Sequence, residues 1–185
     1  ITGSASEIND SFAANDAQTI SGLGSEFVTL NDTTLDVSTL NTLDGNTSRT
    51  INAANVETLT GEAADLNTAY DSVGISGLGD AAVTITDTTI SSTTLNTLDD
   101  NTEGTVDASN ITSLDGSIDS ATTALSSEGI SGLGSVDVDL SDESLTSGEL
   151  VLLDTKTDGE IDASSVTTLT GTAAASNAVI ISEGI

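Results

Sequence analysis

The chain has 185 residues and carries 30 acidic side chains against one Arg and one Lys, for a formal charge of −28. Because phosphates and anionic lipid headgroups repel so acidic a chain, we expect neither nucleic acid nor a membrane surface as a partner. Cys, Met, Trp, His and Pro are absent, which excludes disulfides, the common catalytic triads and the usual zinc or iron ligands. No stretch approaches about 18 apolar residues, so we expect no membrane insertion.

A five-residue segment, Ile-Ser-Gly-Leu-Gly, recurs along the chain at a fixed interval. It begins at Ile20, Ile75 and Ile130, and Ile185 stands one further interval along. The interval is the same each time and defines a 55-residue repeat, and a period of this size predicts a solenoid or an array. We therefore divide a single array over residues 1–185 into a partial repeat 1–19, repeats 20–74, 75–129 and 130–184, and the start of the next repeat at Ile185. Both ends look cut from a longer array.

Apolar residues occupy equivalent positions in successive repeats. The columns are Val28, Val83 and Val138; Leu30, Ile85 and Leu140; Leu35, Ile90 and Leu145; Leu40, Leu95 and Leu150; Leu43, Leu98 and Leu153; Ile51, Val106 and Ile161; Ala53, Ala108 and Ala163; Val56, Ile111 and Val166; and Leu59, Leu114 and Leu169. Acidic chains are often disordered, but this one is 36% hydrophobic. Apolar residues in register are rare in disordered tails, so the columns predict a stacked core.

Apolar and polar residues alternate over residues 28–30 and 51–53, which predicts short strands. Each repeat looks internally doubled, and residues 28–50 and 51–82 are its two halves. Solenoid coils are commonly about 20–30 residues long, so we expect one coil per half. The fold class is therefore predicted to be an α/β repeat solenoid, related to a β-solenoid or leucine-rich repeat, with short parallel strands and two short helices per 55-residue repeat.

Two helices are expected in each repeat. Residues 61–70 have apolar side chains at helical spacing, with Thr60 as the cap. Residues 38–43 form a shorter helix that Asp44-Gly45 should stop. A helix is about 10 Å wide while stacked strands lie about 4.8 Å apart. Helices on one side would curve the array, and helices on alternating sides would leave it straight; the sequence leaves both arrangements open.

Two acidic columns run through all three repeats. They are Asp32, Asp87 and Asp142, and Asp44, Asp99 and Asp154. Aspartate oxygens accept hydrogen bonds from backbone N–H groups in turns and at helix ends, which is the interpretation that we favour. The alternative is calcium, a hard cation that takes clustered carboxylate oxygens, and the six aspartates are the weak candidates for a metal site. Neither an EF-hand loop nor a Gly-Gly-x-Gly-x-Asp repeat is present.

Threonines in the predicted strands raise a further option. Val28-Thr-Leu30 and Val83-Thr-Ile85 would form a flat Thr ladder of the kind found in ice-binding solenoids, although Asp139 interrupts it in the third repeat. Such threonines are more often solvent-side positions that favour strand geometry. Paired carboxylates alone hydrolyse glycosides, but an array offers no unique place for one active site. We therefore expect no catalytic residue, no cofactor, no small-molecule substrate and no enzyme activity.

Two stretches carry a resemblance to known repeats. Ser38-Thr-Leu-Asn-Thr-Leu-Asp-Gly45 and Thr60-Gly-Glu-Ala-Ala-Asp-Leu-Asn67 resemble the arrays of very large secreted surface proteins of marine cyanobacteria and related bacteria. They also resemble the Thr-Ala-x-Glu-Leu-Asn-x-Leu-Asp-Gly repeat of phage tail fibres. The third repeat departs from both, because Leu150-Val-Leu-Leu-Asp154 lacks the Asn and Ala174-Ala-Ser-Asn177 lacks the Leu. The resemblance implies an extracellular structural role without catalytic residues.

The sequence therefore predicts a structural repeat segment of a long extracellular or cell-surface protein, in a stalk, fibre, filament or surface layer. A phage tail-fibre or adhesin stalk is the first alternative, and a mass of three chains would favour the tail fibre. A calcium-dependent secreted repeat module is the second alternative, which would need metal to fold. The expected partner is the protein itself, by head-to-tail or lateral association, because neither end resembles a polar cap.

Overall fold

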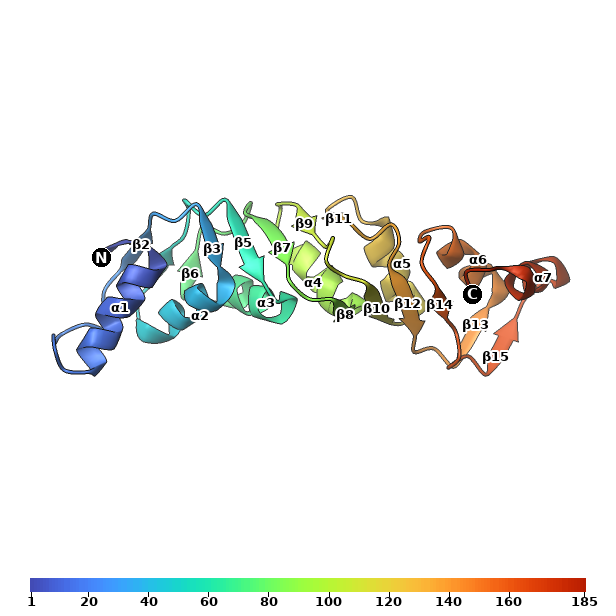
Figure 1. Ribbon diagram of the computed structural model, residues 1–185, viewed down its shortest axis with the longest axis horizontal. Helices are drawn as coiled ribbons and strands as arrows, with labels where there is room; N and C mark the ends of the chain where they lie inside the picture. Colours follow the sequence, from blue (N-terminus) through green and yellow to red (C-terminus); the bar gives the residue numbers. More distant parts are fainter. The chain divides into compact units, whose positions relative to one another are not determined.

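The computed structural model describes all 185 residues, and its strands pair only in parallel (Figure 1). Seven helices alternate with the strands, so the predicted α/β class is confirmed. The chain forms two compact units. One contains Ile1–Ile85 and Leu98–Val106, and the other contains Thr86–Thr97 and Asp107–Ile185. One boundary lies directly after β7 (Ala82–Ile85), and the other two fall inside α4 (Ser92–Asn101) and β9 (Val106–Asp107).

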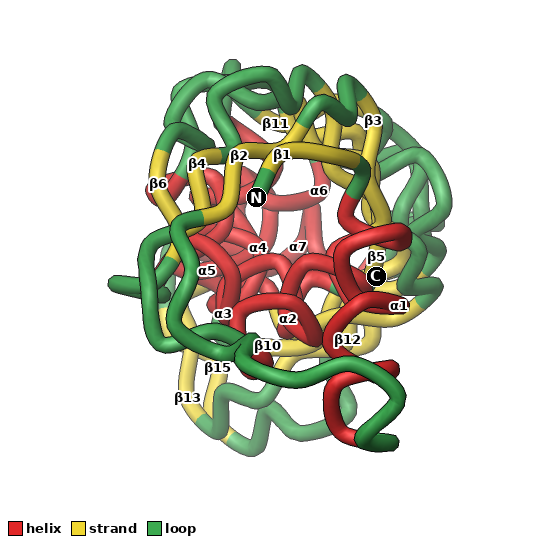
Figure 2. The backbone as a smooth tube through the Cα atoms, turned by 90° about the vertical axis from the view of Figure 1, so that its left-hand side faces the viewer, coloured by secondary structure: helices red, strands yellow, loops and turns green.

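The first unit alternates single helices with one or two short strands. Its elements are β1 (Thr2–Gly3), α1 (Ala5–Asp16), β2 (Val28–Leu30), β3 (Thr34–Asp36), α2 (Val37–Asn46), β4 (Ile51–Asn52), β5 (Thr58–Gly61), α3 (Ala63–Asp71), β6 (Ile75–Ser76) and β7 (Ala82–Ile85). Strands β1, β2, β4 and β6 lie side by side in one sheet, as Figure 2 shows. Strands β3, β5 and β7 pair in a second sheet.

The second unit has the same alternation. Its elements are β8 (Thr89–Ser91), β10 (Ser113–Gly116), α5 (Ile118–Ser126), β11 (Ile130–Ser131), β12 (Asp137–Leu140), β13 (Ser144–Thr146), α6 (Ser147–Asp154), β14 (Ile161–Asp162), β15 (Thr168–Thr170) and α7 (Ala173–Ile181). One sheet has the strand order β14-β12-β10-β8, and β13 pairs with β15 in another. The strands predicted at residues 28–30 and 51–53 are present as β2 and β4.

The interval along the chain between paired strands is shorter than half of the repeat, and we call this interval one step. Leu35 pairs with Leu59 and Leu59 with Val83, so two steps from Leu35 reach Val83. The repeat equivalent of Leu35 is Ile90, which lies beyond Val83 in an additional strand, β8. One repeat is therefore longer than two steps, and the expectation of one coil per half is wrong. Equivalent strands consequently belong to different sheets: β2 joins β1 and β4, whereas β12 joins β10 and β14.

The core of both units consists of the predicted apolar columns. Leu40, Leu95 and Leu150 are at most 2% exposed. Burying a leucine contributes about 1.5–3 kcal/mol relative to leaving it exposed, and the columns supply one such residue every few positions. The last members of three columns depart from this pattern: Leu169 is 38% exposed, and Ala163 and Val166 are only partly buried, whereas their counterparts in the earlier repeats are buried.

The helix that the sequence places over residues 61–70 begins later than expected. Thr60 does not cap it, because the chain remains extended as strand β5 through Gly61. Gly61 has φ +151, and a Cβ at this position would collide with the Val37 side chain one step away. The close approach between steps therefore requires glycine here, and it moves the start of α3 to Ala63 with Glu62 at the N-cap.

The helix predicted at residues 38–43 is longer than expected. Helix α2 continues through Asp44 and Gly45 to Asn46, so the prediction that Asp44-Gly45 stops it is wrong. Two contacts with other steps hold this last turn: the Ser72 hydroxyl donates to Asp44, and the Asn46 amide donates to the Asn9 amide oxygen. Hydrogen bonds between partly buried residues of different steps outweigh the local sequence preference that would end a helix.

Consecutive helices pack against one another inside each unit. Helix α2 contacts α1 and α3, and α6 contacts α5 and α7. Within each unit the helices therefore do not alternate between opposite sides of the strands. The Ile-Ser-Gly-Leu-Gly segment begins with a short strand in its second and third copies, β6 and β11.

Candidate functional site

The first acidic column caps helices across the stack. Asp32 accepts a hydrogen bond from the backbone N–H of Ala5 at 2.9 Å, and Asp142 accepts one from Ile118 at 2.8 Å. Ala5 and Ile118 are the first residues of α1 and α5. Asp87 is the member of this column in the middle repeat. A carboxylate at a helix N-terminus satisfies an otherwise unpaired donor and interacts favourably with the helix dipole.

The second acidic column binds serines of the following step. The Ser72 hydroxyl donates to Asp44 at 2.6 Å, and the Ser182 hydroxyl donates to Asp154 at 3.1 Å. Asp99 stands at the equivalent position of the middle repeat. Asp32 and Asp142 therefore accept from backbone N–H groups, as expected, but the donors lie far away in the chain rather than in a local turn. Asp44 and Asp154 accept from serine hydroxyls, which the turn interpretation did not predict. In no place do three or more His, Cys, Asp or Glu side chains form a group that could hold a metal ion.

A third polar column was missed by the sequence analysis. Thr47, Thr102 and Thr157 are almost fully buried and occupy the same position of successive repeats. Their hydroxyls donate to the backbone carbonyls of Glu26, Ala81 and Val136, at 2.9, 2.9 and 2.6 Å. Each Thr oxygen also accepts from the N–H two residues later, at Arg49, Gly104 and Gly159. The regular recurrence of Thr after each short helix was the available signal.

Asparagine side chains join neighbouring helices. The Asn46 and Asn101 amides donate to the amide oxygens of Asn9 and Asn67, both at 3.0 Å. The Asn41 and Asn96 amides donate to the backbone carbonyls of Asp65 and Ser120, again at 3.0 Å. The third repeat has Val151 and Lys156 at these two positions, so its helix α6 lacks both kinds of bond.

The Thr ladder expected from the sequence does not form. Thr29 and Thr84 belong to strands β2 and β7, which lie in different sheets. The neighbours of Thr29 in its sheet are Thr2 and Asn52. Because one repeat is not a whole number of steps, equivalent threonines cannot stack, and this argument for an ice-binding surface is lost.

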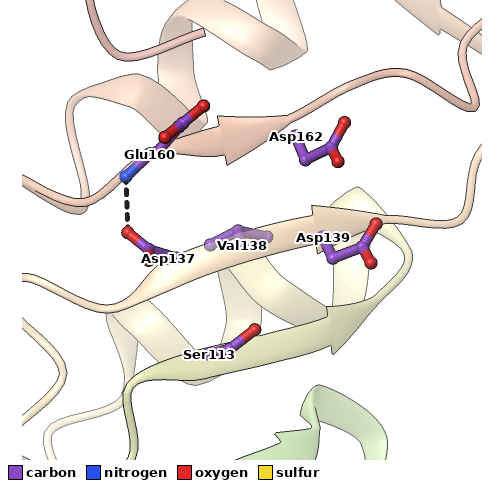
Figure 3. Close-up of a pocket in the computed structure, with 6 residues that line it drawn as sticks. All are labelled: Ser113, Asp137, Val138, Asp139, Glu160 and Asp162. Atoms are coloured by element: carbon purple, nitrogen blue, oxygen red, sulfur yellow. Dashed lines mark hydrogen bonds between the residues drawn. The ribbon is translucent and has the colours of Figure 1, made fainter.

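A shallow acidic hollow lies over strands β10, β12 and β14. Its lining residues are Ser113, Asp137, Val138, Asp139, Glu160 and Asp162 (Figure 3). The backbone N–H of Glu160 donates to Asp137 at 2.8 Å. Asp162 accepts a bond from the backbone N–H of Ser164, and this bond lowers the pKa of the Asp162 carboxyl. Four acidic side chains line the hollow, and exposed carboxylates attract solvent cations in general rather than one bound ion.

The remaining buried polar groups are all paired within the protein. Every buried side-chain nitrogen and oxygen has a hydrogen-bond partner. Burial raises the pKa of Tyr70, whose hydroxyl donates to the Ala81 carbonyl. No helix is long and apolar enough to cross a membrane. No protein-family model, curated protein or solved structure matches the chain, so inference about its role depends on these contacts.

Proposed function

We propose that the chain is a solenoid segment with a structural role, in a stalk, fibre, filament or surface layer outside the cell. The observation that carries the proposal is the use of the recurrent polar residues. The aspartate, threonine and asparagine columns donate to or accept from adjacent steps. Residues reserved for binding or catalysis would instead leave polar atoms directed at an open site.

Under this proposal, the polar columns and the apolar core both stabilise the packing of one step on the next. Each step buries its apolar residues against the next, and the buried threonine hydroxyls and the partly buried carboxylates fix the register between the steps. Unpaired buried polar groups cost about 1–3 kcal/mol each, so a slipped register would be penalised at every column. This arrangement suits a rod that must keep its shape, with the repeats in direct contact only with their neighbours.

The alternative that most needs a test is the calcium-dependent module. Residues kept for a ligand often destabilise the ligand-free protein, so replacing them stabilises it. Residues kept for structure do the opposite. Asp142 distinguishes the two, because its carboxylate has an identified structural partner at the N-terminus of α5.

We expect Asp142→Ala to lower the free energy of unfolding by about 1 kcal/mol in EDTA, which is the usual cost of losing a helix cap. The matched control is Asp115→Ala, which removes the same charge from an exposed position of the same unit and should not destabilise. The measurement is thermal unfolding followed by circular dichroism. A higher melting temperature for Asp142→Ala in EDTA, with calcium stabilising the wild type alone, would replace the structural proposal with the calcium module.

A further inference from the structure

The turn after helix α1 holds a backbone conformation that no other residue with a side chain adopts. Gln18 has φ +59, and it is the only residue other than glycine with a positive φ. The left-handed region costs such a residue about 1–2 kcal/mol, and residues strained in this way cluster at functional sites. The backbone N–H groups of Thr19 and Ile20 both donate to the Ala14 carbonyl, at 3.0 and 3.3 Å. These two bonds hold Gln18 at the tip of the turn.

The turn is longer than its counterpart in the next repeat. Residues 13–19 stand where the next junction has only residues 71–74, and every residue from 16 to 22 is exposed. Val73, which lies one 55-residue repeat after Gln18, is also fully exposed, although its junction lies well inside the sequence. The exposure of this junction therefore belongs to the repeat, whereas the added length and the left-handed turn belong to the first junction alone.

The side chain of Gln18 is free. Gln18 is the only glutamine of the chain, and its carboxamide makes no hydrogen bond within the protein. By contrast, the Asn15 side chain at the end of α1 accepts a bond from the backbone N–H of Leu23 at 3.1 Å. A free carboxamide at the tip of an exposed turn is accessible to an enzyme that acts on surface loops.

The only lysine of the chain also departs from its column. Lys156 stands where the first two repeats have Asn46 and Asn101, whose amides join neighbouring helices. The Lys156 ammonium gives up that bond and forms no ion pair, although the chain has 30 acidic side chains. A residue that breaks a local pattern without a compensating contact is a candidate for function rather than for stability.

We propose that Gln18 is an acyl-donor site for covalent cross-linking, with Lys156 of a second copy of this chain as the acceptor amine. This proposal rests on the structural function proposed above, for which it supplies a bond between copies. Each copy offers one glutamine and one lysine, so the products are linear chains of copies rather than a branched network.

The co-reactant is a transglutaminase, an enzyme that forms a covalent intermediate between its own cysteine and a protein glutamine. The cysteine thiol adds to Cδ of Gln18, a thioester forms, and the amide nitrogen leaves as ammonia with the proton of the thiol. Nζ of Lys156 then attacks the thioester carbonyl. The Cδ–Nζ amide bond forms, the thioester bond breaks, and the proton that Nζ loses returns to the cysteine sulfur.

The first test follows the uptake of a small primary amine. The full chain is incubated with a purified calcium-independent transglutaminase and an excess of a biotin-labelled alkylamine, and intact mass spectrometry counts the labels. The wild type should gain one label with the loss of one ammonia, and Gln18→Asn should gain none. A wild type that stays unlabelled would overturn the proposal.

A matched variant separates a built site from exposure alone. Val73→Gln combined with Gln18→Asn moves the carboxamide to an equally exposed junction that lacks both the added residues and the left-handed turn. Circular dichroism checks that this variant folds. It should be labelled at least tenfold more slowly than the wild type, because its carboxamide is not held at the tip of a long turn. Equal rates would show that any exposed glutamine suffices and would overturn the assignment of a site to this turn.

The second test omits the labelled amine and identifies the acceptor. Because each copy carries a charge of −28, the reaction is run in 0.5 M NaCl, where the Debye length is about 4 Å. The wild type should give a ladder of multiples of 18.4 kDa on a denaturing gel. Lys156→Arg should still take up the labelled amine but should give no ladder, and a ladder from this variant would overturn Lys156 as the acceptor.

Mixing two variants tests the contact between copies. Gln18→Asn supplies only the amine and Lys156→Arg supplies only the acyl donor, so an equimolar mixture should give cross-linked pairs and nothing larger. A mixture without pairs, at enzyme levels that label the wild type fully, would show that two copies do not present these residues to one another and would overturn the proposal. The structural function would still stand in that case if Asp142→Ala destabilised the chain as expected.

Discussion

The two units have the same apolar core but differ in the residues on the solvent side of their strands. In the first unit, Thr60 of β5 pairs with Thr84 of β7. In the second unit, Asp115, Asp139 and Asp162 lie side by side on β10, β12 and β14. Thr84 and Asp139 stand at the same position of the repeat. The strand register is therefore set by the buried side chains and the backbone. The solvent-side positions tolerate either three aspartates in a row or two threonines next to Asp36 of β3.

The helices differ in a related way. In the first unit, helix α2 is joined to α1 and α3 by Asn46 and Asn41. In the second unit, Val151 of α6 and Lys156, two residues beyond the end of α6, stand at these positions, and α6 packs against α5 and α7 without the two amide bonds. The amides thus add to the packing but are not required for it, because the leucines beneath them are buried in both units.

The largest effect on stability should come from substitutions in the apolar core, which both units have. Leu40→Ala and Leu95→Ala each remove a fully buried side chain, so each should lower the free energy of unfolding by about 2–5 kcal/mol. Leu152→Ala is the control, since Leu152 is 51% exposed. Chemical unfolding followed by circular dichroism measures all three, and an unchanged stability of Leu95→Ala would show that the stacked core is wrongly drawn.

An intermediate effect is expected at the helix contacts. Asn46→Ala removes the bond to Asn9 and leaves that amide oxygen partly buried without its donor, which should cost about 0.5–1.5 kcal/mol. Lys156→Ala, at the equivalent position of the third repeat just beyond α6, should change stability by less than about 0.5 kcal/mol. Amide hydrogen exchange of α2 and α6 reports each change locally. Equal losses in the two helices would contradict the difference between the units.

The smallest effect on stability is expected from substitutions of the solvent-side residues that lie side by side on neighbouring strands. Asp139→Thr places the first unit's residue between Asp115 and Asp162 and should stabilise the second unit by a few tenths to about 1 kcal/mol in 10 mM NaCl. The gain should vanish in 0.5 M NaCl, where screening removes the repulsion. Thr84→Asp, beside the neutral Thr60, should destabilise less than Asp139→Thr stabilises. Thermal unfolding at both salt concentrations measures the stability of Asp139→Thr and Thr84→Asp. A gain for Asp139→Thr that persists at high salt would mean that the three aspartates do not repel one another.

Several features could be predicted from residues alone because they depend on local chemistry. The apolar columns identified Leu40, Leu95 and Leu150 as core, and the alternation at residues 28–30 identified a strand. The α/β class followed from the two kinds of periodicity. The aspartates were expected to accept from backbone N–H groups in local turns; Asp32 and Asp142 do accept from backbone N–H groups, but from helices distant in the chain.

The partners of those residues could not be predicted, because each lies about one step away in the chain. Asp44 finds its donor in the later residue Ser72, and Thr102 finds its acceptor in the earlier residue Ala81. No local pattern marks such pairs. The ends of α2 and α3 were misplaced for the same reason, since tertiary contacts at Asn46 and Gly61 outweigh the local stop and cap signals.

The sequence by itself determined the 55-residue period, the buried columns and the kinds of element in each repeat. Only the tertiary structure decided how that period is divided among the sheets. The length of a step is the number of residues between two paired strands, for example between Leu59 and Val83. Only the pairing in the folded chain sets this number. Because one repeat is longer than two steps and shorter than three, equivalent strands such as β2 and β12 join different sheets, and equivalent side chains acquire different neighbours.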